Sequence, residues 1–86
     1  MAWTVYILEC ADGTLYTGIA TDVAARLARH AEGKGAKYMR GRVPFLLRYI
    51  ERYDNRSDAL KRERIIKSFS RQSKWQLINR SGVLSG

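Results

Sequence analysis

Residues 4–18 of this 86-residue chain read TVYILECADGTLYTG, and this stretch decides the fold. It holds two runs rich in aromatic and β-branched residues, which are typical of β-strands. The sequence Ala-Asp-Gly at residues 11–13 separates the two runs and suits a tight turn. We therefore predict a β-hairpin whose strands span residues 3–10 and 14–19.

The turn allows two registers, and they place the hairpin tyrosines differently. A two-residue loop would pair Glu9 with Tyr16 and put Tyr6 and Tyr16 on opposite faces of the sheet, because side chains alternate along a strand. A three-residue loop that ends in Gly13, with a left-handed glycine backbone, pairs Leu8 with Tyr16 and puts both tyrosines on one face. We predict the three-residue loop, because glycine falls at its third position.

Hydrophobic periodicity predicts four further elements, and the chain shows no internal repeat or low-complexity tract. They are a helix that begins after Thr21 or Asp22 and ends near Glu32, a strand over 45–53, a helix that begins after Asn55 or Ser57 and ends near Phe69, and a short helix over 72–79. We therefore predict a single α/β (α+β) domain over residues 1–80, in which helices flank a three-stranded sheet in the order ββαβα(α), followed by a flexible tail over 81–86.

The first predicted helix carries polar residues beside its apolar stripe. At about 100° per residue, Val23, Leu27 and Ala31 form the stripe that faces the core. Arg26 and His30, which are one turn apart, fall at the edge of that stripe. We expect both side chains at the border of the buried face, although a solvated helix surface is the alternative for each residue taken singly.

Glu63 holds a similar position on the second predicted helix, where it shares a side with Ala59 and Ile66. Its neighbours Arg62 and Arg64 could pair with it on the surface, and such exposed pairs contribute only about 0–1 kcal/mol. The helical position argues against that alternative, because a carboxylate beside two apolar residues is partly desolvated and needs a cation.

The chain is strongly basic. It has 16 Lys and Arg residues against 8 Asp and Glu residues, a net charge of +8 and a pI near 10.2. A small domain with this balance is expected to bind polyanions, of which nucleic acid is the commonest, although the charge could serve solubility alone. A glycine-bearing stretch without acidic residues concentrates the charge, and we predict that it binds nucleic acid through Lys34, Lys37, Tyr38, Arg40 and Arg42.

The single cysteine, Cys10, has no partner for an internal disulfide and no Cys/His set around it. This excludes a disulfide scaffold and a zinc finger, and it favours a reducing compartment. No signal-peptide pattern opens the chain, and no apolar run approaches the ~20 residues of a membrane span. We expect a cytoplasmic protein with no membrane partner.

The ordered set of polar residues, taken together, resembles the GIY-YIG nuclease superfamily, and most closely its small stand-alone single-domain members. Thr4 and Val5 stand where the first motif has glycine and isoleucine, and Thr17 stands at the middle of the second. The matching positions are Tyr6 in the first motif, Tyr16 and Gly18 in the second, Arg26 and His30 on the first helix, and Glu63 on the second helix.

The resemblance implies a metal-dependent endonuclease that hydrolyses phosphodiester bonds in DNA, with structure-specific or repair-related cleavage as open options. It implies that Tyr6 or Tyr16 is the general base, that Arg26 holds a phosphate oxygen and that Glu63 binds Mg²⁺ or Mn²⁺. His30 could bond Tyr6, bond the phosphate or act on the leaving group. We expect the five catalytic candidates to open onto one shallow concave surface.

Two alternatives concern activity and partners. A non-catalytic nucleic-acid-binding protein could keep the nuclease fold, although binding alone would not need an inward-facing Glu63. RNA remains open as a substrate beside DNA. Because the chain has no second recognition domain, a homodimer or a protein partner could supply specificity.

Overall fold

The computed structural model describes residues 2–32 and 44–81. Its elements are β1 (Trp3–Cys10), β2 (Leu15–Ala20), α1 (Val23–Ala31), β3 (Phe45–Tyr53), α2 (Arg56–Lys67) and α3 (Arg71–Ser81). The predicted ββαβα(α) order is therefore confirmed. The predicted nucleic-acid-binding residues Lys34, Lys37, Tyr38, Arg40 and Arg42 lie outside the described residues.

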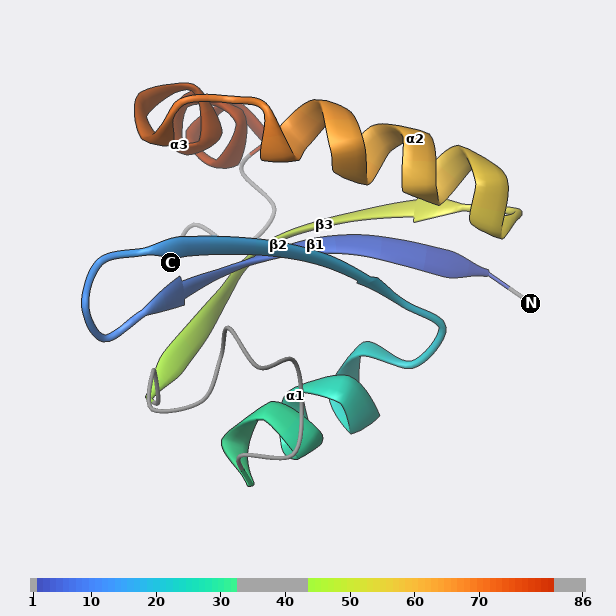
Figure 1. Cartoon of the computed structure of the whole chain (residues 1–86), viewed down its shortest axis with the longest axis horizontal. Coiled ribbons are helices and arrows are strands. Elements are labelled where there is room, and N and C mark those ends of the chain that lie inside the picture. The colour runs from blue at the N-terminus through green and yellow to red at the C-terminus, as the bar shows by residue number, and fades with distance from the viewer. Residues whose placement is uncertain (1, 33–43, 82–86) are drawn as a thin grey trace.

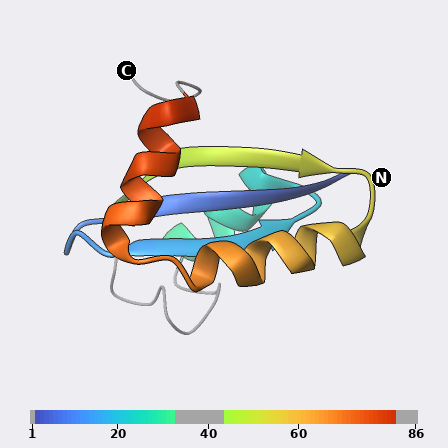
Figure 2. The same ribbon diagram turned by 90° about the horizontal axis from the view of Figure 1, so that it is seen from above.

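The sheet is antiparallel with the strand order β2-β1-β3, so β1 is central and the other two strands form the edges. Helix α1 covers one face, whereas α2 and α3 cover the other (Figure 1). Seen from above, α2 runs alongside β2 (Figure 2). None of the helices in the described part of the chain is long and apolar enough to cross a membrane.

The hairpin adopts the three-residue loop predicted from the sequence. The N–H of Gly13 donates to the carbonyl of Cys10 at 2.9 Å, and Gly13 has a φ of +84°. A left-handed backbone of this kind favours glycine, because a Cβ would strain it. Leu8 lies opposite Tyr16, so Tyr6 and Tyr16 point to the same side of the sheet.

Each face of the sheet has its own apolar cluster, because residues alternate between the faces along β1. Between the sheet and α2 with α3, the cluster consists of Val5, Ile7, Leu15, Tyr49, Ala59, Ile66, Leu77 and Ile78. Between the sheet and α1, it consists of Tyr6, Leu8, Cys10 and Ala20, with Tyr16, Val23, Leu27, Phe45, Leu47 and Ile50 packed against it.

Helix α1 is rotated slightly from the orientation predicted. Asp22 caps it, because its Oδ1 accepts a hydrogen bond from the N–H of Ala25 at 3.0 Å. Val23 and Leu27 pack inward as expected, but Ala31 is exposed and His30 is buried in its place. The imidazole fills more space over the tyrosine face than an alanine methyl could, so the predicted placement of Ala31 was wrong.

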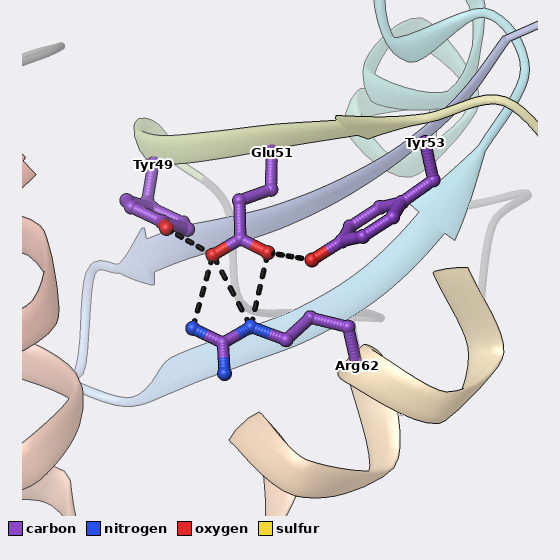
Figure 3. A network of polar contacts seen from close by, with 4 residues as sticks. All are labelled: Tyr49, Glu51, Tyr53 and Arg62. Atoms are coloured by element: carbon purple, nitrogen blue, oxygen red, sulfur yellow. Dashed lines mark hydrogen bonds and ion pairs between the residues drawn. The ribbon is translucent and has the colours of Figure 1, made fainter. Parts of the chain in front are cut away.

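Four polar residues, which we call the Glu51 cluster, fasten α2 to β3 (Figure 3). Both carboxylate oxygens of Glu51 accept a bond from Nε of Arg62, at 3.0 and 3.2 Å, and Oε2 also accepts from Nη2 at 3.1 Å. The hydroxyls of Tyr49 and Tyr53 donate to the same carboxylate. Because Arg62 precedes Glu63 on α2, the cluster also fixes how α2 presents Glu63.

Candidate active site

Tyr6 lies on the central strand β1, directly opposite Gly18 of β2. A Cβ built on Gly18 would lie 2.7 Å from the hydroxyl oxygen of Tyr6 and 2.8 Å from its Cζ. Side chains do not tolerate such contacts, so the absent side chain at position 18 is what allows the phenol to lie across β2. The middle of the hairpin therefore brings the Tyr6 hydroxyl over an edge strand.

Tyr16 and His30 surround that phenol. The ring centroids of Tyr6 and Tyr16 are 6.4 Å apart, and those of Tyr16 and His30 are 5.7 Å apart in an edge-on arrangement. On its other side His30 meets Phe45, also edge-on, at 6.2 Å. These aromatic contacts fix the imidazole orientation.

His30 contacts the Tyr6 hydroxyl through its Nε2 atom at 3.2 Å. Burial lowers the pKa of the imidazole, and the nearby positive charge of Arg26 lowers it further. His30 is therefore neutral at neutral pH, and its Nε2 can accept the phenolic proton. Its buried Nδ1 has no hydrogen-bond partner among residues 2–32 and 44–81.

Arg26 supplies the positive charge of this group and is exposed. One of its terminal N–H groups donates to the carbonyl of Ile19 at 3.4 Å. Burial and the neighbouring Tyr16 raise the pKa of Tyr6 to about 12, while the charge and hydrogen bonding of Arg26 oppose that rise. Arg26 is thus the residue positioned to stabilise a phenolate at Tyr6.

Glu63 approaches from α2, which lies along the same edge strand. Its side chain is 14% exposed, and Lys67 lies one turn away with its Nζ 3.4 Å from Oε2. After burial, the charge of Glu63 is the largest influence raising the pKa of Tyr16, and it also raises that of Tyr6. The carboxylate is therefore within electrostatic reach of both phenols.

The structure thus brings together all five predicted catalytic residues, with one correction. Tyr6 and His30 are 0% and 1% exposed, so the expectation that both open onto a concave surface was wrong. They pack into the apolar layer under α1, where Gly18 has no side chain to block the Tyr6 ring. Tyr16 and Glu63 are half-buried and Arg26 is exposed, so these three form the accessible part of the group.

Comparison with known proteins bears on this arrangement. The family model described as the GIY-YIG catalytic domain matches residues 2–77. The chain belongs to the GIY-YIG catalytic domain family. The predicted resemblance is therefore confirmed, and the family is one of nucleases.

Small single-domain GIY-YIG proteins are similar to this chain over most of their length. A UPF0213 protein of Halobacterium salinarum is 54% identical over 70 residues, which cover 81% of this chain and 91% of that protein. A UPF0213 protein of Staphylococcus aureus is 54% identical over 74 residues, which cover 86% and 90% of the two chains.

Two solution structures share the fold. A UPF0213 protein from Bacillus halodurans is 47% identical and superposes with a TM-score of 0.63, covering 96% of this chain and 88% of that one. A protein from E. faecalis is 33% identical with a TM-score of 0.69, covering 100% and 92%. The three-stranded sheet with flanking helices is therefore the fold of these relatives too.

GIY-YIG nucleases generally depend on a divalent metal ion, and the residues present can be tested for that chemistry. Within the described ranges, no three His, Cys, Asp or Glu residues gather as a multi-ligand metal site. Mg²⁺ and Mn²⁺ need no such cage, because they keep several waters and bind through one or two carboxylates. A single carboxylate such as Glu63, with phenolic oxygens near it, fits a hard cation.

Two features near Glu63 were missed from the sequence. Glu51 interrupts an apolar strand pattern, and only its tertiary partners reveal the Glu51 cluster. Lys67 follows Glu63 at helical i,i+4 spacing, which is a recognisable ion-pair pattern. That spacing could have placed Lys67 beside the candidate site.

Proposed function

We propose that this protein is a divalent-metal-dependent endonuclease that hydrolyses phosphodiester bonds in DNA, with RNA as a second possible substrate. The observation that carries the proposal is the gathering of the Tyr6–His30 pair, Tyr16, Arg26 and Glu63 over one edge strand. These groups supply proton transfer, an anion-binding cation and a carboxylate for a hard metal ion, which phosphodiester hydrolysis requires together.

Proton transfer is assigned to Tyr6 with His30. The high pKa of Tyr6 keeps its phenol protonated at rest, so the phenol becomes a base only when its proton has an acceptor. His30 Nε2, 3.2 Å away and neutral, is such an acceptor. The half-buried Tyr16 is the alternative base, and its phenolic oxygen would accept a hydrogen bond from the attacking water.

Phosphate binding is assigned to Arg26. Its guanidinium donates one N–H to the Ile19 carbonyl at 3.4 Å and interacts with Tyr6, and the residue is exposed to solvent. A planar guanidinium binds two phosphate oxygens at once and stabilises the negative charge that grows there during hydrolysis. The same charge favours the phenolate of Tyr6, so one residue serves both needs.

Metal binding is assigned to Glu63, whose half-buried carboxylate is within electrostatic reach of the two phenols. When bound, Mg²⁺ or Mn²⁺ would neutralise charge on the phosphate and lower the pKa of a coordinated water. Lys67 forms an ion pair with the same carboxylate at 3.4 Å, which offsets part of the cost of holding that charge in a partly buried position.

The experiment that tests this function compares cleavage of linear, nicked, flapped and branched DNA, with a matched RNA strand, in Mg²⁺, Mn²⁺ or EDTA. Metal-dependent cleavage by the wild type, with Tyr6→Phe reduced at least about 100-fold, is expected. Tyr49→Phe is the matched control, because it removes one buried phenolic hydroxyl from the opposite face of the sheet. Tyr16→Phe separates the two candidate bases.

The outcome that would overturn the nuclease proposal is equally concrete. If the wild type cleaves no tested substrate with either ion but still binds DNA, a nucleic-acid-binding module replaces the enzyme. Sedimentation of the protein with and without DNA then shows whether a homodimer forms, which is one route by which so small a domain could gain specificity.

A further inference from the structure

Two cations of α3 are fastened to the β1–β2 hairpin. Nζ of Lys74 donates to the Leu15 carbonyl at 3.2 Å, and Nε of Arg71 donates to the Gly13 carbonyl at 3.1 Å. Both side chains line a cavity of about 370 Å³ whose other walls come from the hairpin turn, including Asp12. The main-chain carbonyls therefore hold the two charges in place beside the start of β2.

Lys67 extends this pair toward the candidate active site. Its Nζ lies 3.4 Å from Oε2 of Glu63. Lys67 is the last residue of α2 and Arg71 is the first residue of α3, so the three cations follow one another around the junction of the two helices. Burial lowers the pKa of Lys74, and the positive charge of Lys67 lowers it further. Arg71 and Lys74 of α3, together with Lys67 at the end of α2, thus lead from Glu63 to the hairpin turn, and we call these three residues the α3 cationic row.

Lys74 of this row is half-buried, and it differs from two other half-buried cations among the described residues. Arg48 is neutralised by Glu9 at 2.9 Å, and Arg62 is neutralised by Glu51 at 3.0 Å. Among residues 2–32 and 44–81, by contrast, neither Lys74 nor Arg71 forms an ion pair with a carboxylate. Fixed cations that bond only to carbonyls keep most of their N–H groups for an external anion.

A nucleic-acid strand supplies such anions in series. Its phosphates recur along the chain, and they attract ordered lysine and arginine side chains whatever the base sequence. The row begins one helical turn from the carboxylate assigned to metal binding, so a strand lying on it would pass directly into the site.

We propose that the α3 cationic row binds the phosphates of the DNA strand on the hairpin side of the cleavage site. This inference rests on the proposed function, because it assumes that the strand enters the site at Glu63. The row fixes the direction in which the strand leaves that site, along β2 toward the β1–β2 turn. Arg71 and Lys74 contribute to binding rather than to bond cleavage.

The test measures DNA binding in a Glu63→Gln background by fluorescence anisotropy between about 50 and 300 mM KCl. Adding Arg71→Gln and Lys74→Gln should weaken binding about tenfold and flatten the log–log salt slope by about 1.4–1.8, since each lost phosphate contact removes about 0.7–0.9. The matched control is Lys61→Gln with Arg64→Gln, which removes the same charge from exposed positions on α2.

A smaller change of slope in the control than in the Arg71/Lys74 variant is the expected result. Equal changes in both would overturn the proposal, because only net charge would then matter. The variant Arg71→Lys with Lys74→Arg keeps both charges and should keep the slope, provided that circular dichroism shows each variant folded. If the salt slope also flattens in this charge-conserving variant, the two residues support the fold rather than bind phosphate, and the proposal is wrong.

The outcomes also separate this inference from the proposed function. Binding is measured without cleavage, so a wild type that cleaves nothing leaves the slope result valid. If the wild type cleaves DNA but the Arg71/Lys74 variant and its control change the salt slope equally, only the proposal for the α3 cationic row is overturned.

Discussion

Two groups of the same residue types lie on this small domain, and they behave in opposite ways. The Glu51 cluster combines two tyrosines, an arginine and a glutamate, and so does the candidate site of Tyr6, Tyr16, Arg26 and Glu63. In the Glu51 cluster the carboxylate accepts bonds from all three neighbours (Figure 3). In the candidate site, Glu63 has only Lys67 as an ion-pair partner within the described residues.

The pKa of Glu51 reflects how fully its own neighbours satisfy its carboxylate. Burial alone would raise the pKa of Glu51, but the bonds and charge of Arg62 and the tyrosine hydroxyls outweigh it, so that pKa lies below its usual value. Tyr49 and Tyr53, each with a pKa raised to about 12, act as donors to that carboxylate. In the Glu51 cluster the polar groups satisfy one another's hydrogen bonding, whereas the carboxylate of the candidate site can still bind a ligand.

The comparison teaches that composition alone does not mark a functional site. A carboxylate surrounded by its own donors holds two elements together and has nothing left to bind. A carboxylate whose partner is a half-exposed lysine can exchange that partner for a metal ion. Arg62 and Glu63, consecutive residues of α2 that project about 100° apart, meet these two different situations.

The largest expected effect separates the two glutamates by activity. Glu63→Gln should lower cleavage by about a thousandfold or more, roughly 4 kcal/mol of barrier, because the amide cannot neutralise a metal ion. The melting temperature should move little, since an i,i+4 pair with an exposed lysine contributes about 0.2–0.5 kcal/mol. A Glu63→Gln protein that cleaves like the wild type, or that fails to fold, would break the comparison.

Glu51→Gln should give the reverse result. It leaves the partly buried Arg62 charge without a carboxylate, which costs about 2–4 kcal/mol in the free energy of unfolding. For a domain of this size, each kcal/mol lowers the melting temperature by about 4–8 °C. Cleavage per folded molecule, assayed well below that temperature, should stay within about threefold of the wild type.

The same residue predicts an acid dependence with a definite sign. Because the folded pKa of Glu51 lies below its unfolded value of 4.5, its contribution is present above pH 4.5 and is lost as the pH falls through the folded pKa. Urea unfolding at pH 7 and pH 3 should therefore converge for wild type and Glu51→Gln at the lower pH. A difference that persists at pH 3 would show that packing, rather than charge, explains the loss.

Gly18→Ala tests how the candidate site is built. The new Cβ would fall 2.7 Å from the Tyr6 hydroxyl oxygen, so the ring must move away from His30. We expect a loss of about 1–3 kcal/mol in stability and about 100-fold in cleavage, because the base is displaced. Gly13→Ala is the control: it strains a φ of +84°, costs about 1–2 kcal/mol and leaves Tyr6 in place.

The sequence predicted the strands and the hairpin register correctly, because local chemistry determines both. Gly13 at the third loop position selects the turn, and the turn sets which face each tyrosine occupies. The strand limits 3–10 and 45–53 match β1 and β3 for the same reason, since turn residues bound them. The rotation of the first helix was less well predicted, because Ala31 and His30 compete for the core and the contacts of His30 with Tyr6, Tyr16 and Phe45 are tertiary.

The sequence predicted which residues form the candidate site but not how deeply Tyr6 and His30 are buried. The order of Tyr6, Tyr16, Arg26, His30 and Glu63 gave its members, since helical and strand periodicity place them on known faces. The burial of Tyr6 depends on the missing side chain of Gly18 and on how α1 packs against the sheet. Both are properties of the tertiary structure. The Glu51 cluster escaped prediction for the same reason: its partners come from β3 and α2, and no short spacing links them.

The smallest expected effect concerns the protonation of His30. Its ring must be neutral in the folded protein if it is to accept the proton of Tyr6. Its folded pKa lies below the unfolded value of 6.5, so the unfolded chain binds a proton that the folded chain does not. The stability that depends on neutral His30 is therefore complete above pH 6.5 and falls as the pH drops through that value toward the folded pKa.

Urea unfolding of the wild type between pH 7.5 and pH 5.5, a window above the carboxyl range, should show this decline. His30→Phe keeps an aromatic ring at the position but cannot titrate, so its unfolding free energy should be nearly constant over the same window. Because His30 is the only histidine of the chain, a decline of equal size in His30→Phe cannot come from an imidazole. That result would mean that His30 is protonated as easily in the folded chain as in the unfolded one. Tyr6 would then lack the neutral proton acceptor that distinguishes it from the tyrosines of the Glu51 cluster.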